Sequence, residues 1–119
     1  MANRYWVGGS GTWDSTSTTN WSASSGGASG ASVPTGVDSV FFDQAATYTV
    51  TMTGGLPCAN FTVSAGTVTF TGAPTLAING SMSLVAATVW SATGTIGFTS
   101  VSAGNTITTN GVSIGSSIT

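Results

Sequence analysis

The feature that most limits the fold of this chain is a series of short segments in which apolar and polar residues alternate. From Thr47 to Thr53, the apolar residues Tyr48, Val50 and Met52 alternate with threonines, and this period of two is typical of a half-buried β-strand. Similar segments follow, and glycines or a proline separate most of them. No segment has an apolar stripe at the 3.6-residue period of a helix. The sequence therefore predicts an all-β protein with essentially no helix.

The expected strands are short, and their centres recur about every seven to ten residues. We predict strands within Asp38–Asp43, Thr47–Thr53, Asn60–Ser64, Thr67–Thr71, Thr75–Asn79, Met82–Val85, Thr88–Trp90, Thr95–Thr99, Asn105–Thr109 and Val112–Ile114. The segment Gly54-Gly55-Leu56-Pro57 is expected to break the strand before it. The side chains predicted to face inward are Tyr48, Val50, Phe61, Phe70, Leu76, Ile78, Leu84, Ile96 and Phe98.

Two architectures are built from short, evenly spaced strands, the β-solenoid (β-helix) and the β-sandwich. A sandwich usually has longer strands and charged outer faces. A solenoid accommodates short strands and stacks equivalent Thr, Asn and apolar residues with little charge, in turns of roughly 20–24 residues. We therefore favour a short-stranded β-solenoid, with a β-sandwich as the alternative.

The near absence of charge excludes several function classes. The chain has one Lys or Arg (Arg4), three Asp or Glu and no His, so charged residues make up 3% of the sequence against about 25% in an average soluble domain. Nucleic-acid binding needs clustered cations, and nucleophilic triads and zinc sites need histidines or several cysteines. There is also no apolar run of about 18 residues. We expect no enzyme activity, no catalytic residue, no cofactor, no metal, and neither nucleic acid nor membrane as a partner.

The remaining reactive groups have simpler structural roles. Asp38 and Asp43 are the closest pair of carboxylates, but their odd separation points them to opposite faces of one uninterrupted strand. Turn or edge positions explain such aspartates, because their side chains bond to local backbone. Cys58 has no His, Lys or second Cys to activate it, which favours a small buried side chain.

Residues 1–36 differ from residues 37–119. The first region contains Tyr5, Trp6, Trp13 and Trp21 and a Gly/Ala/Ser stretch near residues 24–32, and we interpret it as an irregular anchor or cap module with a flexible loop. Residues 37–119 are the strand-repeat body. The four aromatic residues are interpreted as a small core or docking anchor, or as a platform on which a glycan stacks.

Paired threonines raise the question of ice binding. They occur as Thr47-Tyr48-Thr49, Thr67-Val68-Thr69 and Thr69-Phe70-Thr71. A threonine ladder that matches an ice lattice needs the same pair on every turn, whereas the intervals between these pairs along the sequence are irregular. The sequence alone therefore argues against this function.

The opening Tyr5-Trp6-Val7-Gly8-Gly9-Ser10-Gly11-Thr12-Trp13-Asp14, with Asn20-Trp21-Ser22 and Pro34 before Asp38-Ser39-Val40-Phe41-Phe42-Asp43, resembles the N-terminal region of bacteriophage virion proteins of the tail-fibre or appendage type. Thr106-Ile107-Thr108-Thr109-Asn110-Gly111 is similar to their β-rich body. The resemblance implies a fibrous virion structural protein, commonly a homotrimer, that docks to other virion proteins and serves host attachment. It implies no active-site residues.

The first residues have no apolar segment of a secretion signal. We expect a chain that is made in the host cytoplasm and carried in the virion. The alternative function, from another class, is a carbohydrate-binding module that recognises host surface glycans.

Overall fold

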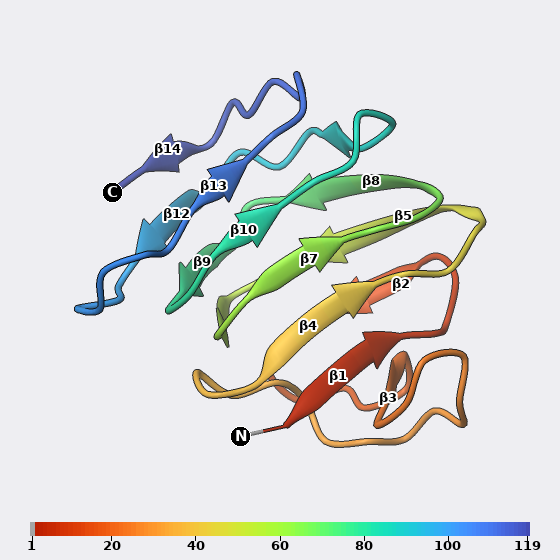
Figure 1. Ribbon diagram of the computed structural model, residues 1–119. Coiled ribbons are helices and arrows are strands. Elements are labelled where there is room, and N and C mark those ends of the chain that lie inside the picture. Colours follow the sequence, from red (N-terminus) through yellow and green to blue (C-terminus); the bar gives the residue numbers. More distant parts are fainter. Residues whose placement is uncertain (1) are drawn as a thin grey trace.

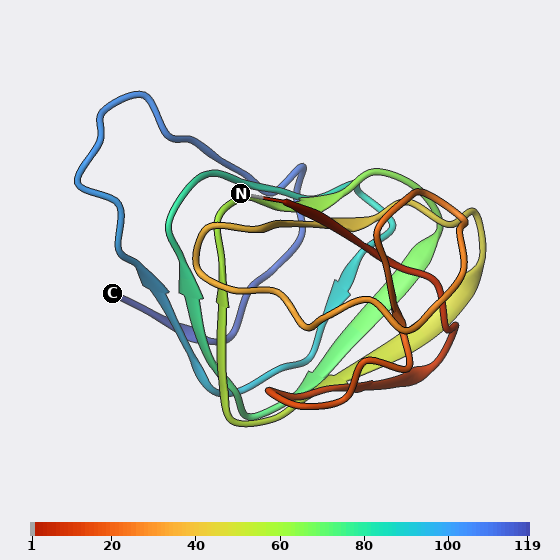
Figure 2. The ribbon, with the colours of Figure 1, turned by 90° about the horizontal axis from the view of Figure 1, so that it is seen from below.

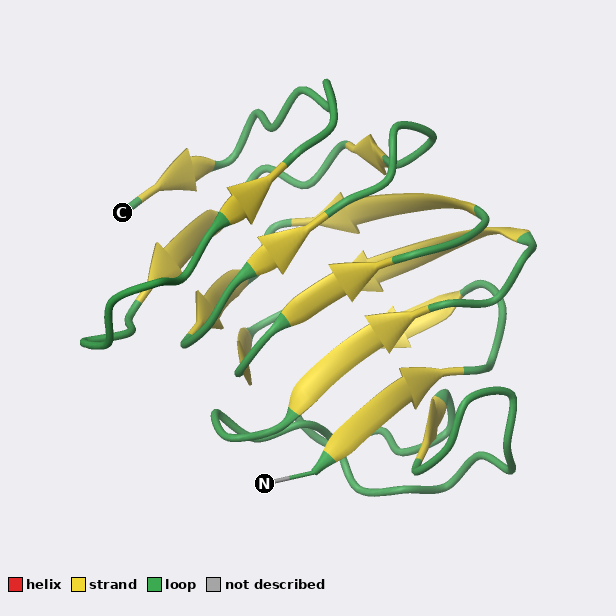
Figure 3. Ribbon diagram, viewed as in Figure 1, coloured by secondary structure: helices red, strands yellow, loops and turns green. Residues whose placement is uncertain are grey.

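The computed structural model describes residues 2–119, and within this range it contains fourteen strands and no helix (Figure 3). The strands wind into a β-solenoid of about four turns (Figure 1). The prediction of an all-β, short-stranded solenoid is therefore confirmed. Viewed along the winding axis, the chain traces a roughly three-sided outline, with one sheet on each side (Figure 2).

Sheet A has six strands, in the spatial order β13 (Ile107–Thr108), β10 (Met82–Ser83), β7 (Phe61–Val63), β4 (Ser39–Phe42), β1 (Asn3–Trp6) and β3 (Trp21–Ser22). Sheet B has four, in the order β11 (Val89–Trp90), β8 (Thr67–Gly72), β5 (Thr47–Met52) and β2 (Gly11–Trp13). Sheet C has four, in the order β14 (Ser117–Ile118), β12 (Thr95–Phe98), β9 (Thr75–Ile78) and β6 (Gly55–Cys58). All neighbouring strands are parallel except β1 and β3.

The register shows the length of a turn. In sheet A, Val40 aligns with Phe61, and Phe61 aligns with Met82. In sheet C, Leu56 aligns with Leu76, and Leu76 with Ile96. The central turns are therefore displaced by 21 residues in sheet A and by 20 in sheet C, within the range expected for such repeats.

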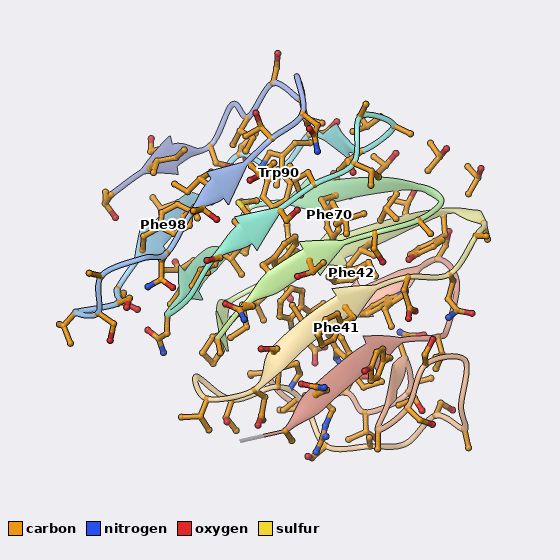
Figure 4. All side chains as sticks on the ribbon, in the orientation of Figure 1. Phe41, Phe42, Phe70, Trp90 and Phe98 are labelled. Atoms are coloured by element: carbon orange, nitrogen blue, oxygen red, sulfur yellow. The ribbon has the colours of Figure 1, made fainter. Side chains whose placement is uncertain are left out.

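The core is a column of inward side chains from the three sheets. Of the nine residues predicted to face inward, eight are buried, and Phe98 is partly buried and packs against the core. Phe42, Phe70 and Trp90 lie between the sheets (Figure 4). Since Thr and Ser occupy many of the outward positions, the solenoid needs few charged residues on its surface.

The expected break after the strand at Thr47–Thr53 is confirmed, since β5 ends at Met52, but the break is short because Gly55–Cys58 already forms β6. The corner lies at Gly54, whose φ of 74° suits glycine. Proline fits this strand because β6 is the edge of sheet C. The N–H groups of Thr75 and Asn79 donate to the carbonyls of Gly54 and Cys58, so the backbone groups of the even-numbered residues of β6 point toward β9. The backbone of Pro57 points away from β9, and its missing N–H therefore costs no hydrogen bond of the sheet.

The expected strand at Val112–Ile114 is wrong. Asn110 and Gly111 both have positive φ, and the N–H of Val112 bonds to the carbonyl of Thr109. This Asn-Gly turn reverses the chain, and the last strand forms at Ser117–Ile118 instead.

Residues 1–36 were expected to form a separate irregular module. In the structure, β1 pairs with β4, and β2 pairs with β5, in the same sheets as residues 37–119. The described part of this region thus supplies two strands of the first turn, followed by β3 and a long connection to β4 (Figure 1).

Candidate functional site

Three of the four aromatic residues selected for docking are core residues. Trp6, Trp13 and Trp21 are 0–1% exposed. The ring of Trp21 stands edge-on to those of Trp6 and Trp13, with centroid distances of 5.1 and 5.3 Å. Their burial corrects the glycan-platform interpretation for these three, because a sugar cannot stack on a ring that other side chains cover.

Tyr5 lies on the outer face of sheet A and stacks on Phe41 of the next strand. The ring centroids are 4.9 Å apart, and the planes differ by 18°. Sequence reasoning missed Phe41 as the partner, although its position beside buried Phe42 on one strand marks it as outward-facing. Each ring covers one face of the other, so the pair offers less stacking surface than two separate rings.

The solenoid is closed at the end where β1 lies. There β3 pairs antiparallel with β1, and Trp21 fills the interior. The guanidinium of Arg4 donates to the carbonyl and to the hydroxyl of Ser32, each at 2.7 Å. This contact holds the connection between β3 and β4 against the first turn.

Asp38 stabilises the same end of the solenoid through hydrogen bonds. Its carboxylate accepts hydrogen bonds from the N–H of Ala2 and from both the N–H and the hydroxyl of Thr35, at 2.9–3.0 Å. Burial alone would raise the pKa of Asp38, but these hydrogen bonds and the charge of Arg4 together hold the pKa below its usual value. This aspartate has a turn-stabilising role, as its residue type suggests.

The opposite end of the solenoid is open. Ile107 aligns with the core residue Met82, and Ile118 aligns with the core residue Ile96. Both side chains therefore point toward the interior of the solenoid, yet each is 51% exposed. The strands that carry them, β13 and β14, are the last in their sheets, so one edge of each is unpaired among the described residues (Figure 1). We call the surface formed by β13, β14, Ile107 and Ile118 the open end.

Charge is confined to the other half of the molecule. The four charged side chains are Arg4, Asp14, Asp38 and Asp43, and no Lys, Arg, Asp or Glu follows residue 43. The open end therefore presents apolar side chains and free backbone groups without charged side chains.

A pocket of about 320 Å³ lies beside the open end, at the corner between β12 and β13. Phe98 and Ile107 contribute apolar surface, and Ser100, Asn105 and Thr106 contribute polar groups. The corner loop projects outward from the solenoid (Figure 2). Its length reflects an insertion, because Met82 and Ile107 are 25 residues apart, whereas each of the two turns before it in this sheet has 21 residues.

The remaining chemical groups are potential metal ligands and one thiol. Within residues 2–119, no three His, Cys, Asp or Glu side chains gather where a metal ion could bind. The thiol of Cys58 is fully buried, and this burial raises its pKa to about 12. No helix in the described range is long and apolar enough to span a membrane.

Comparisons of the chain with known protein families, with curated proteins and with solved structures find no match.

Proposed function

We propose that this chain is a structural protein of a phage virion, a fibre, appendage or decoration component, and that it works by self-assembly and by docking to other virion proteins. The observation that carries the proposal is the difference between the two ends. Arg4, Asp38 and β3 close one end, whereas Ile107 and Ile118 stay half-exposed at the other.

The open end has the properties of an assembly surface. Unpaired strand edges accept strands from a neighbouring chain. Two half-exposed isoleucines align with core residues of the preceding turn. When a partner removes them from water, the free energy of the complex falls by about 25 cal/mol per Å² of apolar surface buried. No charged side chain must be desolvated there, so the partner can be another copy of the chain.

The virion assignment and the three-fold symmetry rest on the resemblance of residues 5–43 to phage appendage proteins. We expect a homotrimer, or a complex in which another virion protein covers the open end. The expected place of the protein is the particle itself. Mass spectrometry of particles purified from the source culture tests this, and absence of the chain from all particles would contradict the virion assignment.

Analytical ultracentrifugation of the full chain at tens of micromolar tests the assembly. We expect a species near three times the chain mass, and we expect Ile107→Asp and Ile118→Asp to shift it toward the monomer. Val37→Asp is the matched control, since Val37 is 57% exposed but lies far from the open end in the fold. A wild-type chain that stays monomeric would contradict self-assembly.

Carbohydrate binding is the second candidate function, and the corner pocket is the observation that favours it. The pocket combines an aromatic ring, Phe98, with neutral polar groups such as Asn105, a combination that suits a neutral sugar. Glycan-array binding that is lost in both Phe98→Leu and Asn105→Ala would support it. Binding that is unchanged in both would exclude this pocket.

A further inference from the structure

The outer face of sheet B carries a regular array of threonines. Strands β5 and β8 pair in register over six residues, and every outward position from residue 47 to 51 and from 67 to 71 is a threonine. We call this grid of two rows and three columns the threonine array; its members are Thr47, Thr49, Thr51, Thr67, Thr69 and Thr71. Thr12 of β2 extends one column, because it aligns with Thr51.

This alignment could not be read from the sequence. The spacing of Thr-x-Thr pairs is irregular along the chain, but the 20-residue turn of sheet B places the pair at Thr49 and Thr51 directly beside the pair at Thr69 and Thr71. The next turn interrupts the pattern, since Val89 aligns with Thr69. The array therefore repeats the same threonine pair on two successive turns rather than on every turn, and any ice-binding face is limited to the contact between β5 and β8.

The hydroxyl groups of the array have no intramolecular hydrogen-bond partner within residues 2–119. The threonine hydroxyls that do bond inside this range lie elsewhere, at Thr16, Thr19, Thr35, Thr93 and Thr99. Unlike the array, polar side chains at the start of the sheet A strands form hydrogen bonds within the protein. There, Ser39 Oγ accepts from the N–H of Asn60, and Asn60 Oδ1 accepts from the N–H of Ser81.

The array is also held rigidly. Between its threonines, the inward residues of β5 and β8 are buried in the core, among them Val50, Val68 and Phe70 at 0% exposure. Threonine itself is stiff at χ1 because its Cβ is branched. Hydroxyl and methyl groups thus keep fixed positions, repeated about every 4.8 Å between strands and about every 6.7 Å along each strand.

The chemistry of the face limits the ligand. It carries no charge, so it does not select an ionic ligand. It has no aromatic ring on which a sugar could stack, and it lacks the large apolar and aromatic residues that form the centre of a protein interface. A neutral surface with its own two-dimensional repeat of hydrogen-bonding groups fits it best. The repeat between the strands is close to the shorter oxygen repeat of hexagonal ice.

We propose that the threonine array binds ice. In this arrangement, the hydroxyls hydrogen-bond to water at lattice-like positions, and the methyl groups fill the spaces between them. The protein then adsorbs to an ice surface without first ordering its own side chains, which lowers the entropic cost of binding. This inference is independent of the virion assignment and of the open end.

The test is inhibition of ice recrystallisation by the full chain, with thermal hysteresis as a second measurement. We expect the wild-type chain to keep ice grains small and the double variant Thr51→Tyr with Thr71→Tyr to lose this activity by about tenfold or more. Tyrosine keeps the strand propensity but disrupts the flat repeat. Thr51→Ser with Thr71→Ser, which removes only methyl groups, is a milder variant for which we also expect a loss.

The matched control is Thr75→Tyr with Thr95→Tyr. These two threonines also face outward and are aligned on adjacent parallel strands, but they lie on sheet C, where no such grid exists. We expect this variant to retain wild-type activity. An inactive wild-type chain, or equal losses in the array and control variants, would overturn the proposal. So would an array variant that changes only the sedimentation coefficient, because the face would then pack against protein.

Discussion

The indole N–H of Trp90 donates a 2.9 Å hydrogen bond to Oγ of Ser116, and this hydroxyl donates in turn to the carbonyl of Ala92 at 2.9 Å. Both side chains are buried. We expect Ser116→Ala to lower the free energy of unfolding by about 1–3 kcal/mol, because it leaves a buried donor and a buried acceptor unpaired. Urea denaturation measures this, with exposed Ser113→Ala as the control. A Ser116→Ala chain as stable as wild type would refute the role of this network.

The position of Phe42 at the centre of the aromatic core leads to a second prediction. Its ring lies 4.9 Å from Phe70 and 5.3 Å from Phe61, measured between centroids. We expect Phe42→Ala to cost about 3–5 kcal/mol of stability. Phe41→Ala is the control on the same strand, and it should cost less because Phe41 faces outward and is only partly buried. Equal losses measured by thermal or urea unfolding would contradict this account of the core.

Two glycines with similar backbone geometry should differ in their tolerance of a side chain. Gly72 and Gly104 have φ angles of 97° and 91°. A Cβ at Gly72 would lie 2.1 Å from the carbonyl oxygen of Met52, whereas a Cβ at Gly104 would meet open space. We expect Gly104→Ala to cost only the conformational strain of about 1–2 kcal/mol and Gly72→Ala to cost clearly more. Melting temperatures compare the two directly, and a milder effect at Gly72 would argue against the close pairing of β5 and β8.

Asp38 should make the protein sensitive to acid. Its folded pKa is lowered, so its contribution to stability is full above the unfolded value of about 3.9 and is lost as the pH falls through the folded pKa. In Asp38→Asn, the amide NH2 group would replace one of the two carboxylate oxygens, and it cannot accept hydrogen bonds from Ala2 or Thr35. We expect lower stability at pH 7 and a smaller decrease between pH 5 and pH 2 than in wild type. Melting curves across this range measure both effects, and parallel curves for the two chains would contradict the prediction.

The sequence predicted the local pattern better than the alignment between turns. Alternation identified Tyr48, Val50 and Phe70 as core residues, because a strand with one buried face leaves a direct pattern in its side chains. The pattern did not predict that Gly55–Cys58 forms a strand directly after the corner at Gly54, and it predicted a strand at Val112–Ile114 that does not form. Proline is accepted in β6 because that strand is a sheet edge, and an edge is a property of the assembled sheets.

The same limit applies to the candidate sites. Trp6, Trp13 and Trp21 pack together in the structure, but burial, which only the fold determines, decides between a core and a docking role. The exposure of Ile107 and the grid formed by Thr49, Thr51, Thr69 and Thr71 depend on which turns lie next to each other. Neighbouring turns are separated by about 20 residues, beyond the reach of any local pattern.

Because the aromatic rings are unevenly distributed along the solenoid, its turns should unfold locally in a definite order. Each turn of a solenoid contacts only its neighbours, so stability varies along the stack. Aromatic rings pack against one another from Trp6 of β1 to Trp90 of β11, while β13 and β14 are two residues long and each contains a half-exposed isoleucine. Amide hydrogens should therefore exchange first around β13 and β14 and last around β5. The end of the solenoid that contains β1 should therefore unfold last, and local unfolding should begin at the open end.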